Sequence, residues 1–146
     1  MTIPDTNLLI YSVNRNSASH RAALAWLERE LSAGEALLLP WVVILGFLRI
    51  TTRPGLHDQP LTIESAFAFV ESWLNHPSVA IAHPGPEHPR ILRRLLSDVG
   101  TAGNLTTDAH LAALAIEYDG ELCSSDNDFA RFPGLKWHNP LLRPLK

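Results

Sequence analysis

Short apolar runs alternate with longer segments of helical spacing along this chain, and this alternation restricts the possible folds more than any other feature. The runs expected to form strands are residues 2–4, 36–39, 79–82, 121–124 and 135–137. The segments expected to form helices are residues 8–13, 19–32, 41–49, 63–74, 86–99 and, after a cap at Asn104 or Thr106, up to Tyr118. Strand–helix alternation predicts an α/β fold with a parallel sheet and helices on both faces.

Two of the expected helices have apolar surfaces that are expected to pack against other parts of the protein or against a partner. Residues 41–49 are apolar on nearly every face, which predicts burial on several sides. In the following helix, Phe69 and Trp73 form a second apolar pair beside the main stripe, which consists of Ile63, Ala66, Phe67, Val70 and Leu74. Either that pair faces a partner protein, or both stripes pack inside a helical hairpin with residues 41–53.

Length and composition indicate one soluble domain spanning residues 1–146. A chain of 146 residues with 46% hydrophobic residues can bury enough surface to fold without disulfides or a structural metal. Cys123 is the only cysteine and residues 1–13 lack the features of a signal peptide, so a cytoplasmic location is expected. The longest uncharged apolar stretch, residues 36–48, is too short to cross a membrane. A net charge of −3 means that any nucleic-acid function must come from a local site.

Four aspartates fall where the strands are expected to end. Asp5 ends the first strand, Asp126 and Asp128 follow the fourth strand, and Asp108 lies in the first turn of the helix before it. Ligands of parallel sheets bind beyond the carboxyl ends of the strands, so these acids are expected to converge there. Two carboxylates 4 Å apart repel by about 4 kcal/mol at an effective dielectric constant of 20, so such a cluster needs a cation or holds protons. Oxygen ligands of this kind suit Mg²⁺ or Mn²⁺.

Taken singly, each aspartate also has a structural explanation, as a turn residue, a helix cap or a first-turn acid. Their joint placement favours a site, and the neighbouring hydroxyl and amide groups of Thr6, Asn7 and Ser124 could orient ligands there. A phosphoacceptor receiver domain also places aspartates at strand ends. It requires a lysine after the last strand, whereas the only lysines are Lys136 and Lys146, so it ranks lower.

Three motifs and a short tail, taken in order, resemble the PIN-domain ribonuclease toxins of the VapC type. They are Asp5-Thr6-Asn7, the run from Thr107 to Ala115, the run from Ser125 to Phe129, and the tail Pro140-Leu141. The resemblance implies a three-layer α/β/α sandwich with four or five parallel strands. It also implies a Mg²⁺- or Mn²⁺-dependent endoribonuclease that acts on tRNA or rRNA, forms homodimers and is held inactive by a VapB-type antitoxin.

Carried over to this chain, the resemblance assigns metal binding to Asp5, Asp108 and Asp126. It adds Asp128 as an auxiliary catalytic acid, Thr6, Asn7 and Ser124 as supporting residues, and Arg49 as the arginine of a Glu-x-x-Arg motif. The chain departs from that motif, because Gly46 stands where the family has an acidic residue.

Two hypotheses follow from Gly46. The chain is either a ribonuclease impaired by this glycine or a non-catalytic PIN module that binds RNA or antitoxin without cutting. A Glu codon differs from a Gly codon by one base, so natural divergence, spontaneous inactivation and deliberate inactivation all remain open.

Overall fold

A computed structural model of the chain describes residues 1–55, 59–100 and 103–142. Its sheet has five parallel strands in the order β3-β2-β1-β4-β5. The strands are β1 (Thr2–Pro4), β2 (Leu37–Pro40), β3 (Val79–Ala82), β4 (Glu121–Cys123) and β5 (Lys136–His138). In the register, Pro4 of β1 lies opposite Cys123 of β4, so the carboxyl ends of these two central strands meet at one level of the sheet edge.

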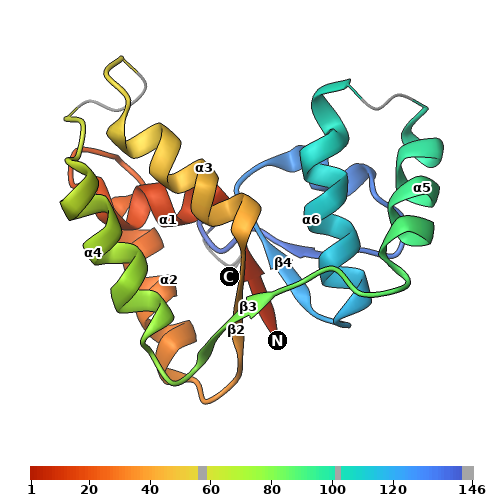
Figure 1. The fold of residues 1–146 in the computed structure, drawn as a ribbon, viewed down its shortest axis with the longest axis horizontal. Coiled ribbons are helices and arrows are strands. Elements are labelled where there is room, and N and C mark those ends of the chain that lie inside the picture. The colour runs from red at the N-terminus through yellow and green to blue at the C-terminus, as the bar shows by residue number, and fades with distance from the viewer. Residues whose placement is uncertain (56–58, 101–102, 143–146) are drawn as a thin grey trace.

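Helices cover both faces of the sheet. α1 to α4 lie on one side and α5 and α6 on the other (Figure 1), which confirms the expected three-layer α/β/α sandwich. The helices are α1 (Thr6–Val13), α2 (His20–Ser32), α3 (Trp41–Thr52), α4 (Ile63–Leu74), α5 (His88–Val99) and α6 (Thr106–Glu117). Two short 3₁₀ segments, η1 (Gly103–Leu105) and η2 (Asn127–Arg131), precede α6 and follow β4.

The core fixes the position of α6, the helix that carries Asp108. α6 packs against α5 and β4, and residues 111–115 are all buried. A helix buried on most sides lacks a polar face, which explains its weak amphipathic pattern. Because α6 is held on several sides, the side chain in its first turn has a defined position at the sheet edge.

Several predicted helix starts were wrong by up to two residues. α1 begins at Thr6 rather than Leu8, because the Asp5 carboxylate caps it by accepting a hydrogen bond from the Thr6 backbone N–H at 2.8 Å. α5 begins at His88 rather than Pro86, after a turn in which the His88 N–H bonds to the Gly85 carbonyl.

The predicted side-chain cap of α6 was also wrong, because Leu105 is the capping residue. The turn η1 runs directly into the helix, and Thr106 is already its first residue. The Thr106 hydroxyl donates backward to the Gly103 carbonyl at 3.0 Å, so the turn, and not a capping side chain, leads into the helix.

The predictions for α3 and α4 had mixed outcomes. Trp73 is buried and its ring meets that of Phe47 edge-on at 5.0 Å, so α3 and α4 pack as a helical hairpin. Phe69, the other member of the pair, is 37% exposed. The packing of both stripes inside the hairpin was wrong for Ile63 and Phe67, which are 56% and 39% exposed. The expected burial of α3 on several sides was wrong for Trp41 and Leu45, which are 48% and 59% exposed, so the described residues leave these two side chains in contact with solvent.

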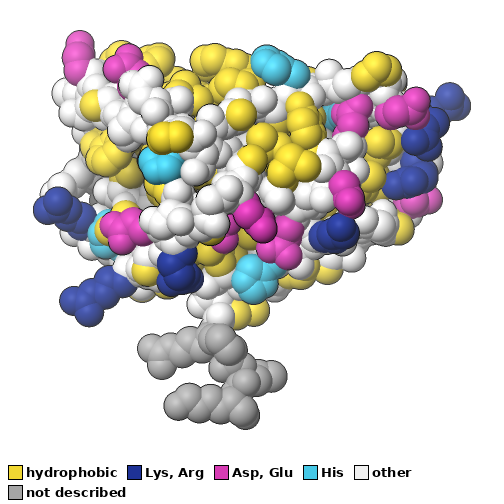
Figure 2. All heavy atoms as spheres, turned by 90° about the horizontal axis from the view of Figure 1, so that it is seen from below, with side chains coloured by type: hydrophobic (Ala, Val, Ile, Leu, Met, Phe, Trp, Pro, Cys, Tyr) yellow, Lys and Arg dark blue, Asp and Glu magenta, His cyan; other side chains and the backbone are white. Residues whose placement is uncertain are grey.

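Lys and Arg side chains lie at both ends of the molecule in the view from below (Figure 2). Those at the end that α5 forms, on the right in both pictures, stand among Asp and Glu side chains. On α5 itself, Arg90, Arg93 and Arg94 are exposed. Within the described ranges, no helix is long and apolar enough to span a membrane.

Candidate metal centre

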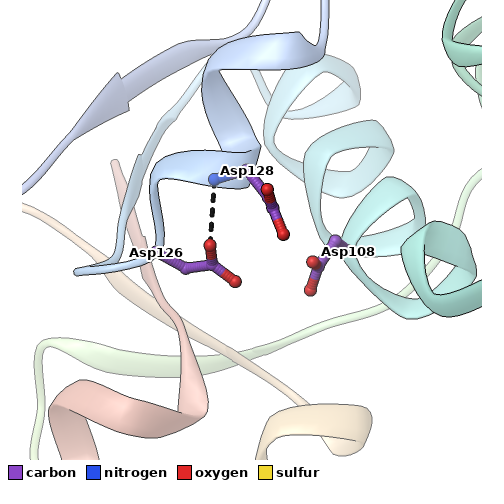
Figure 3. Close-up of side chains that lie close together, drawn as sticks. All are labelled: Asp108, Asp126 and Asp128. Carbon is purple, nitrogen blue, oxygen red and sulfur yellow. Dashed lines mark hydrogen bonds between the residues drawn. The ribbon is translucent and has the colours of Figure 1, made fainter.

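Three aspartates from two elements meet at the carboxyl edge of the sheet. Asp108 lies in the first turn of α6, Asp126 caps η2, and Asp128 lies within η2. One carboxylate oxygen from each lies within 4.8 Å of the others, and the side chains point toward one another (Figure 3). The order β4 then η2 brings two of them beside α6, since β4 and α6 pack together.

The turn after β4 holds Asp126 and Asp128 in place relative to each other. Oδ1 of Asp126 accepts a hydrogen bond from the Asp128 backbone N–H at 2.9 Å, drawn as the dashed line in Figure 3. This bond is an N-terminal cap of η2 and uses one oxygen of Asp126. The other oxygen of Asp126 is left for a ligand.

Asp5 lies beside this cluster, but it is held in a different way. Its Oδ1 caps α1 through the Thr6 N–H, and its Oδ2 accepts a hydrogen bond of 2.7 Å from the Ser124 hydroxyl. The three acids whose oxygens group most closely are therefore Asp108, Asp126 and Asp128, whereas the sequence analysis grouped Asp5, Asp108 and Asp126. Each carboxylate oxygen has a second lone pair, so Asp5 keeps the capacity to bind a cation.

Ser124 is the centre of the hydrogen bonds around the site. Its buried hydroxyl donates to Asp5 and accepts from the Asp126 backbone N–H at 3.0 Å and from the Asn7 amide at 3.4 Å. Its backbone carbonyl accepts from the indole N–H of Trp137 at 3.1 Å. The sequence analysis named Ser124 and Asn7 but missed Trp137, which contacts the site only because β5 pairs with β4.

Burial and mutual repulsion raise the pKa of two site carboxyls. Burial, followed by repulsion from Asp5, Asp126 and Asp128, raises the pKa of Asp108 from 3.8 to about 6. Burial also raises the pKa of Asp5, and its hydrogen bonds from Ser124 and Thr6 oppose that increase only in part. The cluster therefore carries more negative charge than its surroundings stabilise.

The residues present fit a hard divalent cation. All the donors are oxygens and three carboxylates converge, which is the ligand chemistry of Mg²⁺ and Mn²⁺. Beside them, within the described part of the chain, Oδ1 of Asn7 is buried and accepts no hydrogen bond. A cation there would offset the repulsion that raises the pKa of Asp108, and the Asn7 oxygen could accept a hydrogen bond from a water bound to that cation.

The opposite side of the site, formed by α3, has no carboxylate. A Cβ atom on Gly46 would lie 3.0 Å from Oγ1 and 3.2 Å from Cγ2 of Thr6, so the helix passes close to the start of α1. A hollow of about 400 Å³ adjoins the glycine, and Arg49 stands exposed on its rim. It is lined by Thr6, Val42, Leu45, Gly46, Arg49, Ile50 and Thr107. Because Thr6 follows Asp5 and Thr107 precedes Asp108, the hollow borders the acidic cluster.

Comparison with known proteins identifies the family to which this fold belongs. A profile of the PIN domain family matches residues 2–135. The chain is 44% identical to Ribonuclease VapC37 of Mycobacterium tuberculosis over 140 residues, covering 96% of this chain and 97% of the relative. It is 45% identical to Ribonuclease VapC33 of the same species over 141 residues, covering 97% and 99%. The chain therefore belongs to the PIN domain family.

Solved structures share the fold at much lower sequence identity. The structure of FitAB bound to an IR36 DNA fragment has a chain that matches with a TM-score of 0.71 at 16% identity, covering 99% of both chains. VapBC2 from Rickettsia felis, bound to a DNA fragment from its promoter, matches with a TM-score of 0.65 at 16% identity, covering 94% of this chain and 97% of that one. At this identity the likeness establishes the fold alone.

Proposed function

We propose that this chain is a divalent-metal-dependent endoribonuclease and the toxin of a toxin–antitoxin pair. The observation that carries the proposal is the convergence of Asp108, Asp126 and Asp128, whose oxygens lie within 4.8 Å of one another at the edge of a PIN-domain sheet. Curated relatives of nearly the same length are named ribonucleases, which supports RNA as the substrate. The proposed substrates are structured RNAs of the tRNA or rRNA class.

In this proposal Asp108 and Asp126 would hold Mg²⁺ or Mn²⁺ together with Asp5, and Asp128 would be the auxiliary acid from η2. These roles follow the family resemblance, while the oxygens that group within 4.8 Å are those of Asp108, Asp126 and Asp128. Ser124 and Asn7 position these acids through the hydrogen bonds of the Ser124 hydroxyl. When bound, the metal activates a water for attack on the phosphodiester and stabilises the leaving oxygen. Arg49, across the site, offers a cation for a phosphate of the RNA.

The proposed partners are a VapB-type antitoxin and a second copy of the chain, in the cytoplasm. The structural neighbours VapBC2 and FitAB are described as complexes bound to DNA, which supports an antitoxin partner for this chain. The exposed Trp41 and Leu45 of α3 offer apolar surface for a protein partner. Light scattering of the purified chain at micromolar concentration tests the homodimer, and a monomer there would contradict it.

Gly46 underlies the second part of the proposal, that this chain is an impaired enzyme. The site lacks the carboxylate that the family has on α3, so the cation is held more weakly than in a chain with glutamate there. The alternative is a PIN module that binds RNA or antitoxin without cutting, and the same glycine is the observation that favours it.

The test of the activity is cleavage of total RNA by the antitoxin-free chain in Mg²⁺ or Mn²⁺. We expect cuts that disappear with EDTA and in Asp5→Ala or Asp108→Asn variants that remain folded. Cleavage by both folded variants at the parent rate, in preparations from which a mock purification shows no nuclease, would overturn the assignment of these acids. Absence of cleavage by a folded chain and by its Gly46→Glu variant would favour the non-catalytic module.

A further inference from the structure

We propose that the exposed arginine face of α5, formed by Arg90, Arg93 and Arg94, binds the phosphate backbone of RNA beside the acidic site. The inference rests on the proposed ribonuclease function and deepens it, because it assigns a surface that binds the RNA at a distance from the bond that is cleaved. The mechanism above makes no use of these residues. Their spacing, their surroundings and the segment that approaches both them and the acidic cluster each support the assignment.

The three arginines surround one hollow. They lie at positions i, i+3 and i+4 of α5, which places them on one side of the helix, while Ile91 and Leu95 are buried against the core. Together with Pro89 and Ser97 they line a hollow of about 470 Å³. Guanidinium groups and a hydroxyl around one concave surface form a set of hydrogen-bond donors suited to phosphate oxygens.

The charge on this face is incompletely balanced by the protein. Arg90 pairs with Glu87 at 2.6 Å, where both side chains are exposed. Within residues 1–55, 59–100 and 103–142, neither Arg93 nor Arg94 has a carboxylate oxygen within 4.0 Å. Like charges one helical turn apart repel, so a polyanion seated between these arginines would be stabilised.

The segment between β4 and β5 approaches the arginine face at one residue and the acidic cluster at another. Nη2 of Arg94 lies 3.8 Å from the position that a Cβ atom on Gly134 would take. Three residues before Gly134, Arg131 of η2 reaches Asp128, with Nε 3.8 Å from Oδ1. The segment that Arg94 approaches at Gly134 is therefore the same one that carries Arg131 and, through it, reaches an acid of the proposed metal site.

RNA fits this arrangement better than an acidic protein segment does. A chain with a net charge of −3 has no general attraction for a polyanion, so the substrate needs a local basic track near the cut. The regularly spaced phosphates of one strand could contact the acidic site through a cation and the α5 arginines directly. The four carboxylates of the site would instead repel an acidic peptide that extended toward them.

The test is RNA binding by the full chain in EDTA, which separates binding from cleavage. Fluorescence anisotropy of a labelled oligouridylate is followed over a range of salt concentrations for the parent and for the triple variant Arg90→Gln, Arg93→Gln, Arg94→Gln. Each lost phosphate contact lowers the slope of log affinity against log salt by about 0.7, so we expect a slope shallower by about 2. At low salt we expect the affinity to fall about tenfold or more.

The matched control is Arg21→Gln with Arg29→Gln, which removes two exposed arginines from α2 on the other face of the sheet. This variant is expected to keep the parent slope, and thermal unfolding of both variants checks that they fold. An equal slope in the triple variant and the parent would overturn the inference. So would an unchanged RNA affinity with weakened binding of polyglutamate, because the face would then bind acidic protein.

The inference and the proposed activity fail separately. If the parent chain cuts RNA but its binding slope does not depend on the α5 arginines, the activity stands and this binding surface is wrong. If the slope depends on the arginines but no variant of the chain cuts RNA, the binding surface stands and the proposed cleavage is wrong.

Discussion

The two sides of the candidate site differ in what they offer a cation. The α6–η2 side brings Asp108, Asp126 and Asp128 together. The α3 side presents Gly46, the exposed Arg49 and a hollow of about 400 Å³ lined in part by apolar side chains. One side thus supplies negative charge and the other supplies space and positive charge, so we expect the proposed metal binding to depend on the α6–η2 side together with Asp5.

The largest effect is expected on the acidic side. Asp126→Asn keeps the shape of the side chain and its bond from the Asp128 N–H but removes the charge. Removing a residue that only hydrogen-bonds to a metal ligand typically weakens metal binding 10–100-fold. Removing the charge of a ligand itself should therefore weaken Mn²⁺ binding by about 100-fold or more. Isothermal titration calorimetry measures this, with Asp98→Asn on the exposed side of α5 as the control. Equal Mn²⁺ affinity in parent and Asp126→Asn would show that the metal lies elsewhere.

Removal of the Ser124 hydroxyl should cost stability on the acidic side. Ser124→Ala leaves Oδ2 of Asp5 without the 2.7 Å bond and the Asp126 N–H without its acceptor. Unsatisfied buried polar groups cost about 1–3 kcal/mol each, so we expect a decrease in the free energy of unfolding of that order. Urea denaturation measures it. Ser72→Ala, whose exposed hydroxyl bonds only within α4, should change little, and an equal loss in both variants would contradict the role of Ser124.

The raised pKa of Asp108 predicts that stability depends on pH. The pKa of this carboxyl is about 6 in the fold against 3.8 ordinarily, so the folded state binds the proton more tightly than the unfolded state. Without metal, stability should therefore fall as the pH rises from about 4 through about 6. Asp108 is only half-buried, so after discounting for solvent screening the loss is on the order of 1 kcal/mol.

Asp108→Asn tests this pH dependence directly. Urea denaturation in EDTA should show the variant to be more stable than the parent near neutral pH and about equal to it below the ordinary carboxyl pKa. Mn²⁺ affinity of the parent should rise over the same pH range, because the cation competes with the proton on Asp108. A gain in stability for the variant that is the same at every pH would contradict the raised pKa.

The smallest effect on metal binding is expected on the α3 side. Arg49→Gln removes an exposed cation on the rim of the hollow and leaves the acidic cluster unchanged. Interactions between exposed charges are weak, so we expect the Mn²⁺ affinity to change less than about threefold. Calorimetry under the conditions used for Asp126→Asn measures it. A large change would mean that the α3 side takes part in holding the metal after all.

Local patterns in the sequence predicted the parts of the molecule that depend on local structure. Aspartates after two expected strand ends predicted Asp5, Asp126 and Asp128 at one sheet edge, because the carboxyl ends of parallel strands meet there. Asp108 was expected beside them from its place in the first turn of the helix before the fourth strand. The close grouping of Asp128 with Asp108 could not be predicted, since it depends on how η2 turns after β4. The contact of Trp137 with Ser124 was missed for the same reason, because it requires the pairing of β5.

Contacts between helices also could not be predicted from the sequence. Nε2 of His88 on α5 lies 2.9 Å from Nδ1 of His110 on α6, and His88 also lies 3.5 Å from Glu117. No spacing along the chain indicates this buried group, because it forms only when the two helices pack. The exposure of Trp41 and Leu45 could not be predicted either, because the sequence does not reveal whether another element packs against an apolar side chain.

The most direct test of the contrast between the two sides is to place a carboxylate on α3. RNA cleavage in Mn²⁺ is compared for the parent, Gly46→Glu and Gly46→Gln, where glutamine has the shape of glutamate without the charge. Because a Cβ there lies 3.0 Å from Oγ1 and 3.2 Å from Cγ2 of Thr6, all three are also made with Thr6→Ala, which removes both atoms. We predict that Gly46→Glu alone cleaves faster, by about tenfold or more, and binds Mn²⁺ more tightly. Equal cleavage rates for folded parent and Gly46→Glu would contradict the account.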